Sequence, residues 1–112
     1  MAVVAATVAV TARSYEPSLS VRAGASEAIP GTIDETIALI EAAGGSAFGV
    51  AADLEDDAAR AGLIQSVVDR AGGIDILVNN AGFADYALVE DMPRATFDRT
   101  VAHYLTTPFA LT

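Results

Sequence analysis

Two asparagines, Asn79 and Asn80, stand shortly before Gly82 and directly after an apolar run at residues 74–78, which only Asp75 interrupts. Each asparagine side chain carries both a donor and an acceptor, so it can tie loops together or meet a ligand. Gly82 permits a sharp turn, or a close approach of a ligand to the backbone. The apolar run predicts a short buried strand, as in a parallel sheet. Because ligands of open α/β sheets bind beyond the carboxyl ends of the strands, we expect a binding site here.

Asp53 and Arg13 also follow predicted strands, at residues 47–52 and 5–11. A lone aspartate at such a position ordinarily caps the next helix, and a lone arginine is ordinarily a solvated strand end. The same side chains can bind a ligand, because a guanidinium pairs with a phosphate through two parallel hydrogen bonds. Both strand ends are therefore candidate binding positions.

Two predicted helices lie between these strands. The first, over residues 32–43, opens with a capping box, in which Thr32 and Glu35 each accept a hydrogen bond from the other's backbone amide. The second, over residues 57–71, ends at a Gly-Gly pair. The order strand, helix, strand, helix, strand indicates a parallel α/β sheet. Helical spacing predicts the buried faces Ile33, Ile37 and Ile40, and Leu63, Ile64, Val67, Val68 and Ala71.

The remaining segments are a loop and a last helix. Residues 15–31 are polar and contain prolines and glycines, which predicts a connection longer than usual. Pro93 suits a first helical turn, because its missing N–H costs little there. The helix that follows carries Phe97, Val101 and Leu105 at spacings of four.

Composition narrows the class of protein. A chain of 112 residues makes one domain at most, and 53% hydrophobic residues are enough for a core. The net charge of −9 disfavours nucleic acid and anionic membranes as partners. Absence of cysteine excludes disulfides and thiol chemistry, and fits a cytoplasmic protein. The apolar run at residues 1–10 is too short to span a bilayer.

The segment Asp75–Gly82 resembles the D-x-L-V-N-N-A-G segment of the short-chain dehydrogenase/reductase family. It follows a helix and a Gly-Gly, and it precedes a loop and another helix, in the family's order. The resemblance implies that residues 1–112 form a partial NAD(P)-binding Rossmann domain of α/β class. This chain would supply strands two to four of the doubly wound parallel sheet with their helices. It would lack the first strand and the C-terminal half.

By this resemblance seven residues bind the cofactor: Arg13, Ser14, Asp53, Leu54, Asn80, Ala81 and Gly82. Arg13 and Ser14 would contact the 2′-phosphate or ribose. Ala12 stands where relatives that select NAD carry an acid, so NADP is favoured over NAD. The loop at residues 15–31 is then either a flexible insertion, which we favour, or a flap over the adenosine end.

Asp53 and Leu54 would hold the adenine ring, which leaves the cap of the second helix to Asp56 or Asp57. Residues 80–82 would line the cofactor groove, and Asn79 would brace the sheet.

The chain departs from the family pattern at several points. No glycine-rich turn precedes Ala5, and the catalytic Ser and Tyr-x-x-x-Lys are missing, since the sequence contains no lysine. Tyr104, four residues before Pro108, occupies the position of a family asparagine. We expect His103 to be a partly exposed helix residue. No catalytic or metal-binding residue is therefore assigned.

These observations predict a fragment of an NAD(P)-dependent short-chain oxidoreductase that acts on an alcohol or carbonyl, inactive as given. Its full-length form would be a homo-oligomer, built partly through the helix that begins near Pro93. The alternative is a non-catalytic remnant of the family that binds a nucleotide or a partner.

The expected topology leaves a gap in the sheet. Strand order 3-2-1-4 places the missing first strand between the strands at residues 5–11 and 74–78. Each unpaired buried backbone group would cost roughly 1–3 kcal/mol. We therefore expect that the 112 residues alone make no stable native-like monomer. The chain would be a fragment, have wrongly drawn ends, or fold differently.

Overall fold

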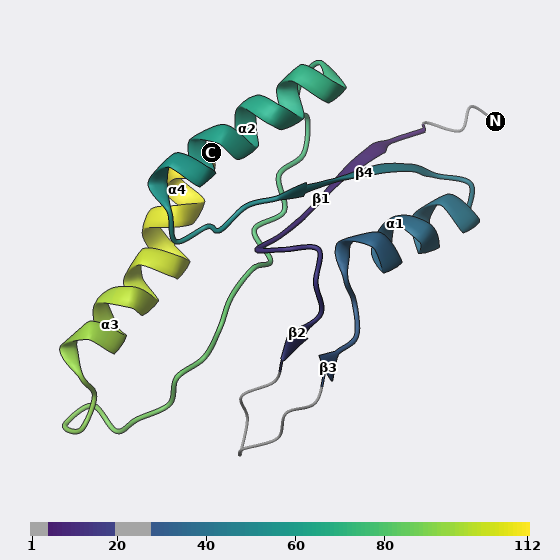
Figure 1. Ribbon diagram of the computed structural model, residues 1–112. Coiled ribbons are helices and arrows are strands. Elements are labelled where there is room, and N and C mark those ends of the chain that lie inside the picture. The colour runs from purple at the N-terminus through teal and green to yellow at the C-terminus, as the bar shows by residue number, and fades with distance from the viewer. Residues whose placement is uncertain (1–4, 20–27) are drawn as a thin grey trace.

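The computed structural model describes residues 5–19 and 28–112, and its centre is a pair of parallel strands (Figure 1). Strand β1 (Thr7–Ala12) runs beside β4 (Ser46–Ala51), with Thr7 opposite Ser46 and Ala12 opposite Ala51. Both predicted strands are thus confirmed with ends shifted by one or two residues. Parallel pairing of neighbouring strands through a helical crossover is the arrangement that the element order indicates.

The two crossover helices begin and end at the residues that the sequence marks. Helix α1 (Ile33–Ala42) has Thr32 as its N-cap, and the capping box with Glu35 is complete. Helix α2 (Asp57–Ala71) is capped by Asp56, whose carboxylate accepts a hydrogen bond from the Ala59 amide at 2.8 Å. Gly72 ends α2 in the left-handed conformation, with φ of 83°.

Helices cover both faces of the strand pair, α1 on one side and α2 on the other (Figure 1). Neighbouring residues of a strand point to opposite faces, and β4 shows this directly. A methyl group at Gly49 would lie 2.4 Å from Ile33 of α1. The Phe48 ring, by contrast, lies 4.2 Å below the guanidinium of Arg70 in α2.

The core is small. Of the described residues, Ile33, Ala52, Leu63 and Val67 are the buried hydrophobic ones, and only Ile33 is fully buried among large side chains. The expected faces are confirmed in part, because Ile37, Ile40 and Ile64 are half-buried. Val68 and Ala71 are exposed, which corrects their prediction.

The predicted strand at residues 74–78 is not formed. This segment is an extended trace without strand pairing, and Ile76 and Val78 are 82% and 77% exposed. Among the described residues β1 pairs with β4 alone, and no strand pairs with this segment. Its backbone amides and carbonyls therefore have no partners in a neighbouring strand, and the segment is exposed.

Residues 15–31 contain more structure than predicted. Strands β2 (Ser18–Leu19) and β3 (Ala28–Ile29) form a short antiparallel pair, with Ser18 opposite Ile29. Residues 20–27 of the predicted loop lie outside the described part. The flexible insertion and the flap both remain predictions.

The last helix runs in three continuous parts. Helix α3 (Arg94–Val101) passes into a π-helical turn, η2 (Ala102–Thr106), and then into α4 (Thr107–Leu111). Pro93 is the N-cap, one position before the predicted first turn. Of the apolar residues at spacings of four, Phe97 and Leu105 are 52% and 66% exposed, and Val101 is half-buried. The last helix contacts α2 through its final part, α4.

In the described part of the chain no helix is long and apolar enough to cross a membrane.

Acidification is expected to loosen the start of α1. Backbone hydrogen bonds from Thr32 and Gly31 lower the pKa of the Glu35 carboxyl below its usual value of 4.5. A lowered pKa in the folded state means that Glu35 contributes its full stabilisation well above pH 4.5 and loses it as the pH falls further. Helical circular dichroism should therefore decrease on acidification, and less so in Glu35→Gln. Asp34→Asn removes a carboxylate from the same turn and should retain the pH dependence; an equal response in both variants would contradict this assignment.

Candidate functional site

The carboxyl ends of β1 and β4 place two of the predicted binding pairs at one edge of the sheet. Arg13 and Ser14 follow β1 directly, and Asp53 and Leu54 follow Ala52 after β4. The two ends are joined where the Ala52 amide donates to the Ala12 carbonyl at 2.9 Å. The parallel pairing therefore brings together side chains that are 40 positions apart in the sequence.

Arg13 and Ser14 are exposed at this edge. The Ser14 hydroxyl donates to the Glu16 carbonyl at 3.3 Å. An exposed guanidinium at a strand end is suited to meet an anionic ligand that approaches from solvent.

Asp53 does not cap α2. Its carboxylate accepts a hydrogen bond from the Glu55 amide at 3.0 Å, and its carbonyl accepts one from the Asp56 amide at 3.1 Å. The cap role belongs to Asp56, as one of the two predicted candidates, and not to Asp57. Asp53 instead shapes a tight turn and stays exposed at the edge of the sheet.

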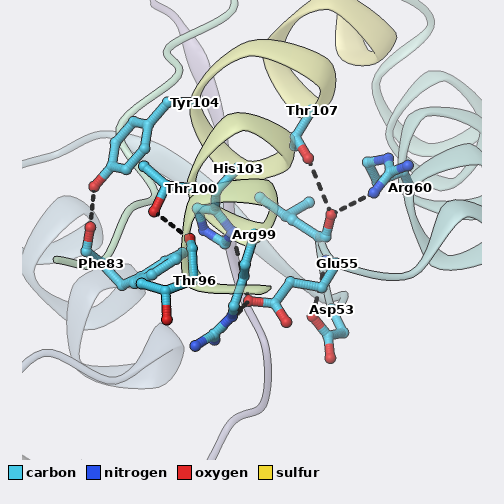
Figure 2. Close-up of polar contacts among 11 residues, drawn as sticks. Asp53, Glu55, Arg60, Phe83, Thr96, Arg99, Thr100, His103, Tyr104 and Thr107 are labelled. Atoms are coloured by element: carbon cyan, nitrogen blue, oxygen red, sulfur yellow. Dashed lines mark hydrogen bonds and ion pairs between the residues drawn. The ribbon is translucent and has the colours of Figure 1, made fainter. Parts of the chain in front are cut away.

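The carbonyl of Leu54 anchors this turn to two helices, through Arg60 and Thr107, which Figure 2 labels. It accepts hydrogen bonds from Arg60 Nη1 at 2.6 Å and from the Thr107 hydroxyl at 3.2 Å. Thr107 is the buried polar residue of the described part, at 5% exposure. Its hydrogen bond meets the requirement that a buried hydroxyl find a partner. The Leu54 side chain packs against the core.

Glu55 connects the same turn to α3. One of its carboxylate oxygens accepts hydrogen bonds from Arg99 Nε at 2.9 Å and from Arg99 Nη2 at 2.7 Å. The hydrogen bond with Glu55 raises the pKa of the Arg99 guanidinium. His103 Nδ1 lies 3.6 Å from the same oxygen, and its side chain is 14% exposed, so the prediction of a partly exposed helix residue is confirmed.

The turn at residues 80–82 is exposed, and it contacts the last helix through Tyr104. The Asn80 amide donates to the Val78 carbonyl at 3.1 Å. Tyr104 lies against Gly82, and its hydroxyl donates to the Phe83 carbonyl (Figure 2). No side-chain hydrogen bond of Asn79 to the sheet is present in the described part, so its predicted bracing role is not seen there.

A cleft of about 280 Å³ separates the Glu55 turn from the last helix. Charged side chains of both signs line it, and they are paired with one another: Glu55 with Arg99, and Asp57 with Arg60. This neutralised lining supplies no net charge for an ionic ligand.

Sequence reasoning missed Glu55, Arg99 and Phe83 as parts of the site. The guanidinium of Arg99 lies 4.2 Å from the Phe83 ring centroid while it binds Glu55. The available signal was weak: Arg99 and His103 are four apart on one helix, a spacing that places both on one face. The partner acid is 44 residues away and carries no local mark.

Comparisons with known proteins agree with this architecture. The family model described as short chain dehydrogenase matches residues 18–112. An uncharacterized oxidoreductase of Thermotoga maritima is 38% identical over 77 residues, which cover 69% of this chain and 30% of that protein. The short-chain dehydrogenase/reductase homolog YusS of Bacillus subtilis is 38% identical over 65 residues, 58% of this chain and 60% of the homolog. The chain thus spans less than two thirds of these relatives.

Solved structures agree on the fold. A crystal structure of a short chain dehydrogenase of Mycobacterium thermoresistibile has a TM-score of 0.78 and 34% identity, over 96% of this chain and 35% of that one. A metagenomic short-chain oxidoreductase in complex with NADP has a TM-score of 0.76 and 31% identity, over 95% of this chain and 42% of that one. The predicted partial Rossmann-like α/β fold is therefore confirmed, and this chain belongs to the short-chain dehydrogenase family.

Proposed function

We propose that this chain supplies the adenosine side of the dinucleotide site of an NAD(P)-dependent short-chain oxidoreductase. The observation that carries the proposal is the pairing of β1 with β4, which puts Arg13 and Asp53 at one sheet edge. This is the edge at which open α/β sheets bind nucleotides. Family membership and the NADP complex of a structural relative support the same assignment.

Individual roles follow from the chemistry of the side chains. Arg13, with Ser14 beside it, binds the 2′-phosphate or ribose, which favours NADP over NAD. Asp53 accepts hydrogen bonds from the adenine amino group, and Leu54 packs near the ring. Asn80, Ala81 and Gly82 line the groove beyond.

The bound nicotinamide would supply hydride transfer with an alcohol or carbonyl substrate. Proton exchange in the family pattern needs a Tyr-x-x-x-Lys, and this chain contains no lysine. We therefore propose that the 112-residue chain by itself has no turnover. The full-length protein would act in the cytoplasm, without nucleic-acid or membrane partners.

A homo-oligomer in the full-length form would use the last helix. Phe97, Leu105 and Phe109 are 52%, 66% and 84% exposed there, an apolar surface that association would cover.

A second candidate, a non-catalytic remnant that binds a nucleotide or a partner, is favoured by Tyr104. Its ring fills the space beside Gly82 and occupies a position where the family pattern has asparagine. This candidate shares the nucleotide site and differs only in having no chemistry.

Calorimetric titration with NADP⁺ and NAD⁺ tests the proposal, in the purified chain where it unfolds cooperatively in urea and otherwise in the full-length protein. We expect saturable binding of both nucleotides, tighter for NADP⁺, because Arg13 adds charge-assisted hydrogen bonds to the 2′-phosphate. Far-UV circular dichroism on the same sample controls for folding. If the chain is helical but binds neither nucleotide, the proposed nucleotide site is wrong. NADPH-dependent carbonyl reduction by this chain would refute the proposal that it has no turnover.

A further inference from the structure

Tyr104 makes a close contact with the turn that follows the unpaired segment. A methyl group built at Gly82 would have Tyr104 atoms as its three nearest neighbours, at 2.6 Å from the hydroxyl and 3.1 Å from two ring carbons. The hydroxyl itself donates a hydrogen bond to the Phe83 carbonyl (Figure 2). The ring thus spans Gly82 and Phe83, and Gly82 is needed there because any side chain would displace the ring.

The direction of Tyr104 depends on the π-helical turn at residues 102–106. A π turn inserts one residue into the helix repeat, which rotates the side chains after it relative to those before it. Arg99 precedes this turn and Tyr104 lies within it. The turn therefore lets one helix present both side chains to the segment around Phe83.

Arg99 joins this segment to the other loop of the site. Its guanidinium stacks over the Phe83 ring at 4.2 Å and donates two hydrogen bonds to Glu55, at 2.9 and 2.7 Å. The Phe83 ring also meets His103 edge to face, with centroids 4.9 Å apart. One helix thereby contacts both the turn after β4 and the turn at residues 80–83.

These contacts matter because no strand holds the turn at residues 80–83 in place. Residues 74–80 pair with no strand among the described residues, and the Asn80 amide bonds only locally, to Val78. The position of residues 80–83 relative to the sheet must then come from side chains. In the described part of the chain, Tyr104, Arg99 and His103 reach them from the last helix.

We propose that Tyr104 is a positioning residue, which fixes the turn at residues 80–83 for nucleotide binding, with Arg99 tying that turn to the Asp53–Glu55 turn. The inference rests on the proposed nucleotide site and adds the residues that preorganise it. A turn held in its bound geometry costs less conformational entropy when the ligand arrives.

The first test measures NADP⁺ affinity by calorimetry in Tyr104→Phe, which removes the hydroxyl and keeps the ring. Loss of one hydrogen bond is expected to weaken binding roughly three- to tenfold. Amide exchange in α2, at Leu63 and Val67, should stay unchanged, which separates positioning from a general loss of stability. Tyr86→Phe is the matched control, since Tyr86 is 86% exposed, and it should bind like the parent chain. Equal affinity of Tyr104→Phe and the parent would overturn the inference.

The second test needs no nucleotide. Gly82→Ala is made in the parent chain and in Tyr104→Ala, and amide exchange around residues 80–83 is measured by NMR. In the parent, the added methyl group should displace the ring and speed exchange. In Tyr104→Ala the same change should have little further effect, because the colliding atoms are gone. Additive effects would refute the Tyr104 contact, whereas absent nucleotide binding with clear coupling would refute only the proposed function.

Discussion

Ile33→Ala is expected to release α1 from the β1–β4 sheet. Ile33 is 1% exposed, and it packs where β4 has Gly49, which leaves room for its side chain. Truncation of a buried isoleucine costs about 2–5 kcal/mol through lost burial and the cavity that remains. The described part has four buried hydrophobic residues, so truncation of one of them removes a large share of the core. Amide exchange in α1, read by NMR, should become markedly faster.

Leu39→Ala on the same helix is the matched control. Leu39 is 73% exposed, so its truncation should change stability by no more than about 0.5 kcal/mol. Ile33→Val, which removes one methylene group, should fall between the two at about 0.5–1.5 kcal/mol. If Leu39→Ala loosened α1 as strongly as Ile33→Ala, the helix would not be held by this contact.

The helices could be predicted because their signals are local. Thr32 and Glu35 mark the start of α1 within four positions of sequence, and Gly72 marks the end of α2 through a backbone conformation that other residues avoid. These interactions form within the helix or its first flanking residues. Pattern alone therefore predicted α2 with the bounds that the structure shows.

The strand at residues 74–78 was predicted wrongly for the opposite reason. A strand is stabilised by hydrogen bonds to a neighbouring strand. An apolar run indicates only that the segment tends to be buried, and it does not indicate whether such a strand is present. Among the described residues no strand pairs with this segment. The family's strand order predicts a gap in the sheet at this place, but the apolar run still predicts strand form for the segment.

The contacts within the site also differ in how far the sequence predicts them. Arg13 and Asp53 could be placed together from topology, because parallel neighbouring strands end at one edge. The contact of Glu55 with Arg99 could not, since charged side chains are common on helix surfaces and nothing local pairs these two. Tyr104 was visible in the sequence as a departure, and only the structure showed that it contacts Gly82.

Arg13→Glu should reverse the nucleotide preference of the chain. Arg13 is exposed at the end of β1, where its guanidinium would pair with the 2′-phosphate of NADP. Loss of hydrogen bonds to a charged group, about 1.5–3 kcal/mol, together with charge repulsion, should weaken binding of adenosine 2′,5′-bisphosphate roughly 100-fold. Binding of 5′-AMP should change little, because it has no 2′-phosphate. An acid at this position accepts hydrogen bonds from a ribose 2′-hydroxyl, so NAD⁺ should bind at least as well as before.

Arg94→Glu makes the same change in net charge at a distance from the sheet edge. Arg94 is 84% exposed at its side chain and pairs with Asp98 at 2.8 Å within α3. A general electrostatic effect of the acidic chain, whose net charge is already −9, would weaken phosphate binding in both variants. A specific contact would weaken it only in Arg13→Glu. Equal losses in the two variants would therefore assign the anion preference to net charge and remove Arg13 from the site. A loss confined to Arg13→Glu would locate the 2′-phosphate at the end of β1.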